Sequence, residues 1–291
     1  MRLNNFGSVG KGYLKFSDFK NFIDKHAYIK VIELANSGEI FLNPDLIKIM
    51  EYAFERNVRL TALGGVNFNT ITNEMIEALV KYRFYSMAIS IDGASQEVYS
   101  LYRRNGDYDK VIENIKKLNE LKRKYNSRLP KLVWQYIIMG HNEDDVISAK
   151  KQAKQLNMDI FFKMTWDKDY KPSKIKMLHA ETKLPFLTME EEASNNPTKL
   201  SAYSLICRQL WICPQINWDG RLLGCCNLFK DDFGINVFEE GLEKAINSDN
   251  FKYAKQLLQG KVPPSPHYKN IPCVSCSDYK QMVENNSFLK I

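Results

Sequence analysis

Five short apolar segments alternate with helical patterns over most of the first 165 residues. They cover residues 30–34, 58–63, 86–91, 132–139 and 159–164, and the run at 86–91 is the most continuous. A continuous apolar run of this length is typical of a strand buried on both faces. Strands that alternate with helices favour parallel βα units. We therefore predict an α/β fold with a partial (βα) barrel of about five parallel strands.

Length and charge narrow the class of protein further. The chain has 291 residues, room for one large and one small domain, and a formal net charge of +7. No run of eighteen apolar residues occurs, so we expect no membrane partner. The basic residues are spread along the chain, and the densest group, 116–124, is expected to be the solvated face of a helix. We therefore do not expect a nucleic-acid partner.

All six cysteines lie in the last 85 residues. Cys273 and Cys276 are separated by two residues, a spacing that lets two thiolates bind one metal ion or one cluster. Cys207 and Cys225, seventeen residues apart, could complete a set of four ligands. The pattern predicts a metal or iron–sulfur site, and spacing alone leaves zinc open as the alternative.

Two other uses of the cysteines are less favoured. The start of the chain shows no basic segment followed by an apolar one, so we expect a cytoplasmic protein with reduced thiols rather than three disulfides. A thioredoxin-like redox pair needs a preceding strand, whereas Ile271 and Pro272 before Cys273 indicate a loop.

The domain boundaries follow from the same patterns. Residues 1–165 are assigned to the barrel, 166–206 to a proline-punctuated connecting region, and 207–291 to a small cysteine-rich domain. Within the last, Asp219-Gly220 predicts a hairpin turn and residues 238–258 a helix. In the barrel, Asn43-Pro44 is expected to open a helix.

Polar residues follow two of the predicted strands, where barrels of this type gather their reactive groups. Glu39 could bind an ammonium group, Ser90 and Asp92 could hold ribose hydroxyls, and Arg103 could pair with a carboxylate. Each also has a plain structural alternative. Glu39 can be a solvated loop acid, Asp92 a turn residue before glycine, and Arg103 an ion-pair partner on a helix.

These segments together resemble a known family. Gly38-Glu39 with Asn43-Pro44-Asp45, residues 89–94, Tyr102-Arg103-Arg104 and the cysteine pattern are similar to the radical S-adenosylmethionine (SAM) enzymes that carry a C-terminal SPASM or twitch extension. The resemblance covers residues 13–279. It implies a partial barrel that binds SAM, followed by a domain that holds one or two further iron–sulfur clusters.

The resemblance also implies site residues. Ser37, Gly38 and Glu39 would contact the SAM amino group, Ser90 and Asp92 its ribose, and Arg103 its carboxylate. Cys207, Cys225, Cys273 and Cys276 would hold one auxiliary 4Fe–4S cluster. Cys213 is an alternative ligand in two-cluster relatives, and Cys226 has no implied role. The implied partners are a peptide or small-molecule substrate and a reductant such as flavodoxin or ferredoxin.

One departure from the family bears on activity. The family holds its SAM-cleaving cluster on a cysteine triad after the first strand, and no such triad occurs here, through truncation or divergence. We therefore expect the chain as given to be inactive in radical chemistry, and whether it is an enzyme is left open. The alternatives are a non-catalytic cluster-bearing module, for electron transfer or partner binding, and a zinc-stabilised structural domain.

Overall fold

The computed structural model describes residues 9–36, 38–165, 168–183, 206–226 and 231–291. The chain forms two compact units. One contains Ala27–Ser194, and the other contains Met1–His26 together with Asn195–Ile291.

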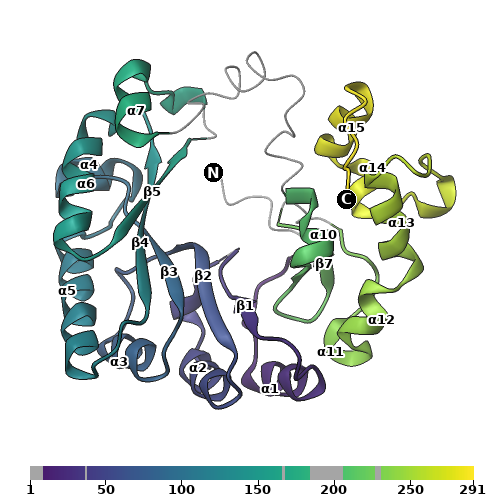
Figure 1. Ribbon diagram of the computed structural model, residues 1–291, viewed down its shortest axis with the longest axis horizontal. Coiled ribbons are helices and arrows are strands. Elements are labelled where there is room, and N and C mark those ends of the chain that lie inside the picture. The colour runs from purple at the N-terminus through teal and green to yellow at the C-terminus, as the bar shows by residue number, and fades with distance from the viewer. Residues whose placement is uncertain (1–8, 37, 166–167, 184–205, 227–230) are drawn as a thin grey trace. The chain divides into compact units, whose positions relative to one another are not determined.

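The unit Ala27–Ser194 is built on a parallel five-stranded sheet with the order β1-β2-β3-β4-β5. The strands are β1 (Val31–Glu33), β2 (Arg59–Val66), β3 (Ser86–Ser90), β4 (Lys131–Ile138) and β5 (Asp159–Met164). All five lie at the places that the apolar runs predict, and the predicted α/β fold is confirmed. Because every strand runs in the same direction, all their C-terminal ends lie at one edge of the sheet (Figure 1).

The middle of the sheet is its most buried part. Every residue of β3 is buried, and β4 contributes Trp134 and Tyr136 with no exposed surface. The Trp134 indole Nε1 donates a hydrogen bond to the carbonyl of Ile91 at 2.6 Å. This bond satisfies the polar atom that a buried tryptophan brings with it. It also fixes the chain just beyond β3, where candidate site residues follow.

Helices cover the outer face of the sheet (Figure 1). They are α2 (Leu46–Glu55), α3 (Asn73–Lys81), α4 (Gln96–Tyr102), α5 (Tyr108–Lys124), α6 (Val146–Gln155) and α7 (Ile175–Thr182), with short 3₁₀ turns at Ile40–Leu42, Glu143–Asp145 and Lys168–Tyr170. Thr72, Ser95 and Asp107 cap three of them, their side chains accepting from backbone N–H groups. The helix expected to open at Asn43-Pro44 begins at Leu46 instead, because Asn43 Oδ1 accepts from Asp45 N at 2.9 Å and holds a turn there.

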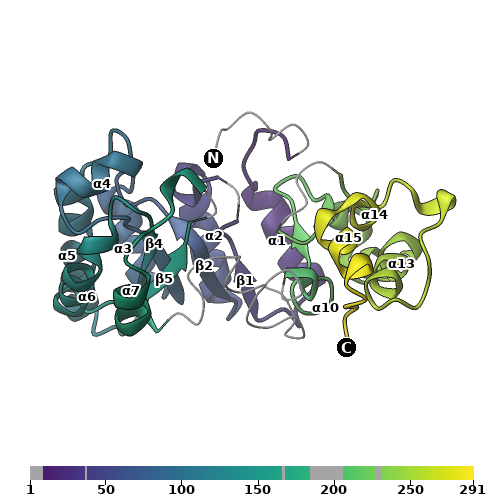
Figure 2. The same cartoon turned by 90° about the horizontal axis from the view of Figure 1, so that it is seen from above.

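The second unit consists of short elements. They are α1 (Phe16–Lys25), α10 (Gln209–Ile212), β6 (Gln215–Ile216), β7 (Leu222–Gly224), α11 (Val237–Glu240), α12 (Leu242–Ile246), α13 (Asp249–Leu258), α14 (Pro272–Ser275) and α15 (Ser277–Glu284), with a 3₁₀ turn at Pro266–Tyr268. Both views show α13, α14 and α15 packed together (Figures 1 and 2). The antiparallel β6–β7 pair turns at Asp219-Gly220, as the sequence predicts.

Two expectations for this unit need correction. Residues 1–26, assigned by sequence to the barrel, group with the C-terminal unit, where His26 Nε2 accepts from Leu242 N at 3.2 Å and Phe22 packs on Phe238. The helix expected over 238–258 is three helices, interrupted at Gly241, whose φ of 91° is left-handed, and again at Asn247-Ser248. A turn, not a strand, leads into Cys273 as the sequence predicts, and Pro272 begins the single helical turn of α14.

No helix within the described residues combines the length and the apolar character needed to cross a membrane.

Candidate functional site

Most of the site residues predicted in the barrel lie near the C-terminal edge of the sheet. Gly38 and Glu39 follow β1, and Ser90 and Asp92 end and follow β3. Arg103 lies at the end of α4, in the same βα connection as Asp92. Gly38 has a φ of 89°, which favours glycine at that position. Ser37 lies outside the described residues.

Glu39 is held by backbone hydrogen bonds. Its Oε1 accepts from Phe41 N at 3.1 Å, which caps the 3₁₀ turn Ile40–Leu42, and its Oε2 accepts from Asn67 N at 2.6 Å, just after β2. Burial raises the pKa of this carboxyl, while these two bonds and the Arg103 charge lower it. Glu39 is therefore a positioned carboxylate that bridges the ends of β1 and β2, rather than a solvated loop acid.

Asp92 and Arg103 form an ion pair. Arg103 Nε and Nη2 both lie 2.7 Å from Asp92 Oδ2, and Asp92 Oδ1 accepts from Ile137 N at 2.8 Å. The Asp92 side chain has no exposed surface, whereas that of Arg103 is 30% exposed. Both carboxylate oxygens are thus bound by protein groups. The geometry matches the ion-pair alternative for Arg103 and ties the end of β3 to β4.

A second polar group links β3, β4 and β5. Gln135 Nε2 donates to Ser90 Oγ at 3.3 Å, and Lys163 Nζ donates to Gln135 Oε1 at 2.7 Å. A Cβ on Gly65 would lie 2.6 Å from Ser90 Oγ and 2.7 Å from Gln135 Nε2, so only glycine lets β2 approach this pair. The sequence predicts Ser90 as a site residue but not Lys163. The position of Lys163 near the C-terminal end of a barrel strand is the sequence signal that indicates a site residue there.

The buried side chain of Asn142 holds the backbone at Asp92 by a hydrogen bond. Its Nδ2 donates to the carbonyls of Asp92 and Ile137 at 3.1 and 2.9 Å, and its Oδ1 accepts from Met139 N at 2.8 Å. Both ends of its side-chain amide therefore bond backbone groups at the ends of β3 and β4. Asn142 positions this edge of the sheet, and its amide is not free to bind a ligand.

The four cysteines predicted as ligands all belong to the C-terminal unit. Burial is the main cause that raises the pKa of Cys207, followed by the charges of Cys225, Cys276, Asp278 and Cys226, and the pKa of Cys273 is raised by burial and then by Cys225, Cys207 and Cys276. Cys207, Cys225 and Cys273 are buried, and Cys276 is partly exposed. None of the six cysteines, all of which fall in described segments, is in a disulfide.

Local structure fixes where these thiols lie. Gly224 precedes Cys225 with a φ of 84°, and a Cβ there would come within 2.5 Å of the Phe233 ring. Cys273 lies in the single turn of α14, and Cys276 ends that turn and begins α15. The hairpin and the α14–α15 junction thus each supply a thiol whose charge raises the pKa of Cys207.

Burial disfavours the charged form of two of these thiols. Burial raises the pKa of Cys207 and Cys273, and the neighbouring thiols raise both further. Thiolates at such a place need a positive partner, which a metal ion or an iron–sulfur cluster provides. Across the described part of the chain, no three His, Cys, Asp or Glu side chains meet closely enough to hold a single metal ion.

Comparison with known proteins identifies the barrel. Residues 18–153 match the model of the radical SAM superfamily, so this part of the chain is a radical SAM domain. The AdoMet-dependent heme synthase of Methanosarcina barkeri is 30% identical over 115 residues, which are 39% of this chain and 32% of that protein. The mycofactocin maturase MftC of Mycobacterium tuberculosis is 28% identical over 121 residues, which are 40% of this chain and 29% of that protein.

A solved structure shares the fold. Streptococcus suis SuiB superimposes with a TM-score of 0.61 at 15% sequence identity, covering 91% of this chain and 65% of SuiB. Its complex with S-adenosylmethionine gives the same TM-score. The chain thus spans about a third of the length of the curated relatives it matches.

The superfamily implies a 4Fe–4S cluster and SAM as cofactors. Residues 18–153 contain no cysteine, so this domain offers no thiolate for such a cluster. All thiols of the 291 residues lie between Cys207 and Cys276. The donor set of residues 18–153 therefore does not fit such a cluster.

Proposed function

We propose that the C-terminal unit binds one auxiliary 4Fe–4S cluster through Cys207, Cys225, Cys273 and Cys276. We propose further that the 291-residue chain does not itself cleave SAM. The observations that support the first part are the spacing of these four cysteines along the chain and the burial of three of them. When bound, such a cluster supplies one-electron transfer.

The second part follows from the number of ligands. A cluster held by four protein thiolates has no iron left to bind the cofactor, and only Cys213 and Cys226 remain outside the set. Both belong to the unit that contains Asn195–Ile291, not to the unit with the radical SAM domain. What remains for the barrel is to bind a ligand at the strand ends.

The composition of the purified protein tests the cluster. After anaerobic purification we expect about four irons and four sulfides per chain, the content of one 4Fe–4S cluster, with a broad visible absorption that dithionite bleaches. Stoichiometric zinc without sulfide would instead establish the zinc-stabilised domain.

The substrate class that the comparisons support is a peptide. One relative is named a maturase, and SuiB has been solved bound to the precursor peptide SuiA. We extend this to the present chain as the partner of its barrel. Flavodoxin or ferredoxin is the class of reductant that a cluster of this kind requires.

We predict weak SAM binding at the strand ends. Glu39 offers a carboxylate to the amino group, but Asp92 already pairs with Arg103 and Ser90 with Gln135, so SAM must displace protein contacts. We expect a dissociation constant on the order of a millimolar, which corresponds to about 4 kcal/mol of binding free energy. Titration calorimetry measures it.

The control for this measurement is a matched pair of carboxylates. Glu39→Gln keeps an acceptor for a backbone N–H but removes the charge, and should lower affinity further. Glu74→Gln, at an exposed position in the first turn of α3, should not. No heat at millimolar SAM, or equal affinity in both variants, would show that Glu39 does not serve this ligand.

A further inference from the structure

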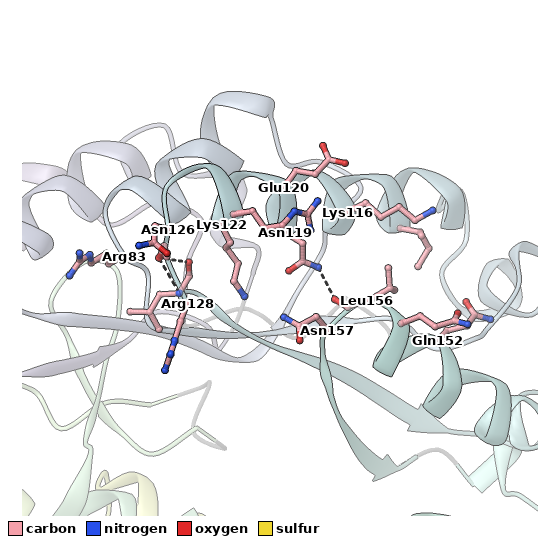
Figure 3. Close-up of a pocket in the computed structure, with 15 residues that line it drawn as sticks. Arg83, Lys116, Asn119, Glu120, Lys122, Asn126, Arg128, Gln152, Leu156 and Asn157 are labelled. Carbon is pink, nitrogen blue, oxygen red and sulfur yellow. Dashed lines mark hydrogen bonds between the residues drawn. The ribbon is translucent and has the colours of Figure 1, made fainter.

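A groove lies at the end of the barrel opposite the candidate cofactor site. It is lined by the second half of α5, the loop leading into β4, the end of α6 and the segment before β3 (Figure 3). All these segments precede the N-terminal ends of strands, whereas Glu39 and Asp92 follow C-terminal ends. The groove encloses about 1170 Å³, far more than a single small anion fills.

The groove is strongly basic. Five cationic side chains line it, and Glu120 is the one carboxylate among the described lining residues. The cations are Arg83, Lys116, Lys122, Arg123 and Arg128. The formal net charge of the whole chain is only +7, so this one groove carries a large part of the excess. The sequence predicts that residues 116–124 form a solvated helix face. In the fold, the cations of this segment line the same groove as Arg83 and Arg128 from other segments.

Four of the five cations are available to a ligand. Lys122 is buried, and its Nζ donates to the carbonyl of Pro130 at 3.0 Å. Arg83, Lys116, Arg123 and Arg128 are exposed. Figure 3 shows Arg83 and Arg128 toward one end of the groove and Lys116 toward the other. The positive charge therefore extends along the groove, as an elongated anionic ligand requires, and three of the four are guanidinium groups suited to carboxylates.

Between the cations the lining offers amide groups. Asn119, Asn126, Gln155 and Asn157 contribute, whereas the amide of Gln152 already bonds Ala94 and Tyr108 within the protein. Asn119 Nδ2 donates to the carbonyl of Leu156 at 2.7 Å, while its buried Oδ1 has no hydrogen-bond partner within the described structure. A buried acceptor without a donor is costly, and a backbone N–H of a bound peptide would satisfy it. Side-chain amides match the alternating donors and acceptors of an extended peptide backbone.

The lining also argues against nucleic acid. Single-stranded nucleic acids bind by stacking their bases on aromatic side chains in addition to contacts with phosphate. None of the described residues that line the groove is aromatic; its apolar members are Ile112, Leu129 and Leu156. The groove has the charges and amides for an acidic peptide but no surface for bases.

From this geometry we infer that the groove between α5 and α6 is a docking site for an acidic, extended segment of a partner protein. Its carboxylates pair with the four exposed cations, and its backbone bonds to the amides, Asn119 Oδ1 included. The groove lies within the unit Ala27–Ser194, and its lining includes no cysteine and none of Glu39, Ser90, Asp92 or Arg103. It therefore works whether or not a cluster is bound.

Fluorescence anisotropy of the full chain with a labelled oligo-glutamate tests the inference. We expect saturable binding that weakens by about tenfold between low and physiological salt, because exposed charge pairs are screened. Lys116→Glu should weaken binding by about tenfold at low salt, and Arg123→Glu with Arg128→Glu should abolish it. Lys110→Glu, an equal change at an exposed position on the same helix but outside the groove, should leave it unchanged.

Three outcomes would overturn the inference. The first is no saturable binding of the oligo-glutamate, or binding that an oligo-glutamine of equal length matches. The second is an equal loss of affinity in Lys116→Glu and Lys110→Glu, which would mean that binding depends only on the net charge of the chain. The third is tighter binding of a labelled oligothymidylate with the same number of charges, which would make the groove a nucleic-acid site. Circular dichroism of each variant checks that the fold is retained.

Discussion

Replacing Cys273 with serine removes most of the iron that the chain binds when it is purified anaerobically. Cys273 is buried and is one of the four proposed ligands, so no solvent molecule can take its place at the metal. A serine hydroxyl is also a far poorer ligand for iron than a thiolate. We expect iron and sulfide to fall together, to less than about a fifth of the wild-type content, with loss of the visible absorption.

Cys226→Ser is the matched control for this change. Cys226 follows Cys225 directly, and its backbone N–H donates to Gln209 Oε1 at 2.8 Å. Serine keeps that backbone bond, so iron content should stay near wild type. Equal losses in the two variants would mean that the four-ligand set is wrong, and full iron retention in Cys273→Ser would remove Cys273 from it.

Asp92→Ala lowers the free energy of unfolding of the barrel by about 3–5 kcal/mol, the usual range when one partner of a buried ion pair is removed. The substitution leaves Ile137 N without its acceptor and Arg103 without the carboxylate that both of its nitrogens contact. Both losses fall at the junction of β3 and β4, in the buried centre of the sheet. Urea denaturation followed by tryptophan fluorescence reports the change, since Trp134 is buried beside this junction.

Lys150→Ala provides the comparison. The Lys150–Glu181 pair has a similar length, 2.8 Å, but both side chains are more than a third exposed. Such a pair contributes about 0–1 kcal/mol because water competes for both charges. If the two variants lost the same stability, Asp92 would be bound no more tightly than a surface acid, and a ligand-binding role for its carboxylate would become the better explanation.

The sheet could be predicted because its strands are specified locally. The apolar run over residues 86–91 contains β3, and the side chains of Thr72 and Ser95 cap α3 and α4. Hydrophobic periodicity and caps depend on residues within a few positions of each other, so sequence alone reveals them.

The parts that sequence missed depend on contacts between distant segments. Helix α1 packs with the C-terminal unit through His26 and Leu242, more than two hundred residues apart, which no local pattern encodes. The role of Lys163 becomes clear only when β5 lies beside β4 and brings it to Gln135. Likewise, the sequence offered Asp92 and Arg103 as separate ligand contacts, but the fold pairs them with each other.

The measurement that tests the central claim most directly is reductive SAM cleavage by the chain with its cluster loaded. With dithionite and SAM under anaerobic conditions, chromatography should show no 5′-deoxyadenosine above the protein-free background. The reason is that residues 18–153 contain no cysteine, and that the cluster proposed for the C-terminal unit would use four of its six thiols. Turnover above background that disappears in Glu39→Ala would contradict this account, because it would show a working SAM-cleaving site in the barrel.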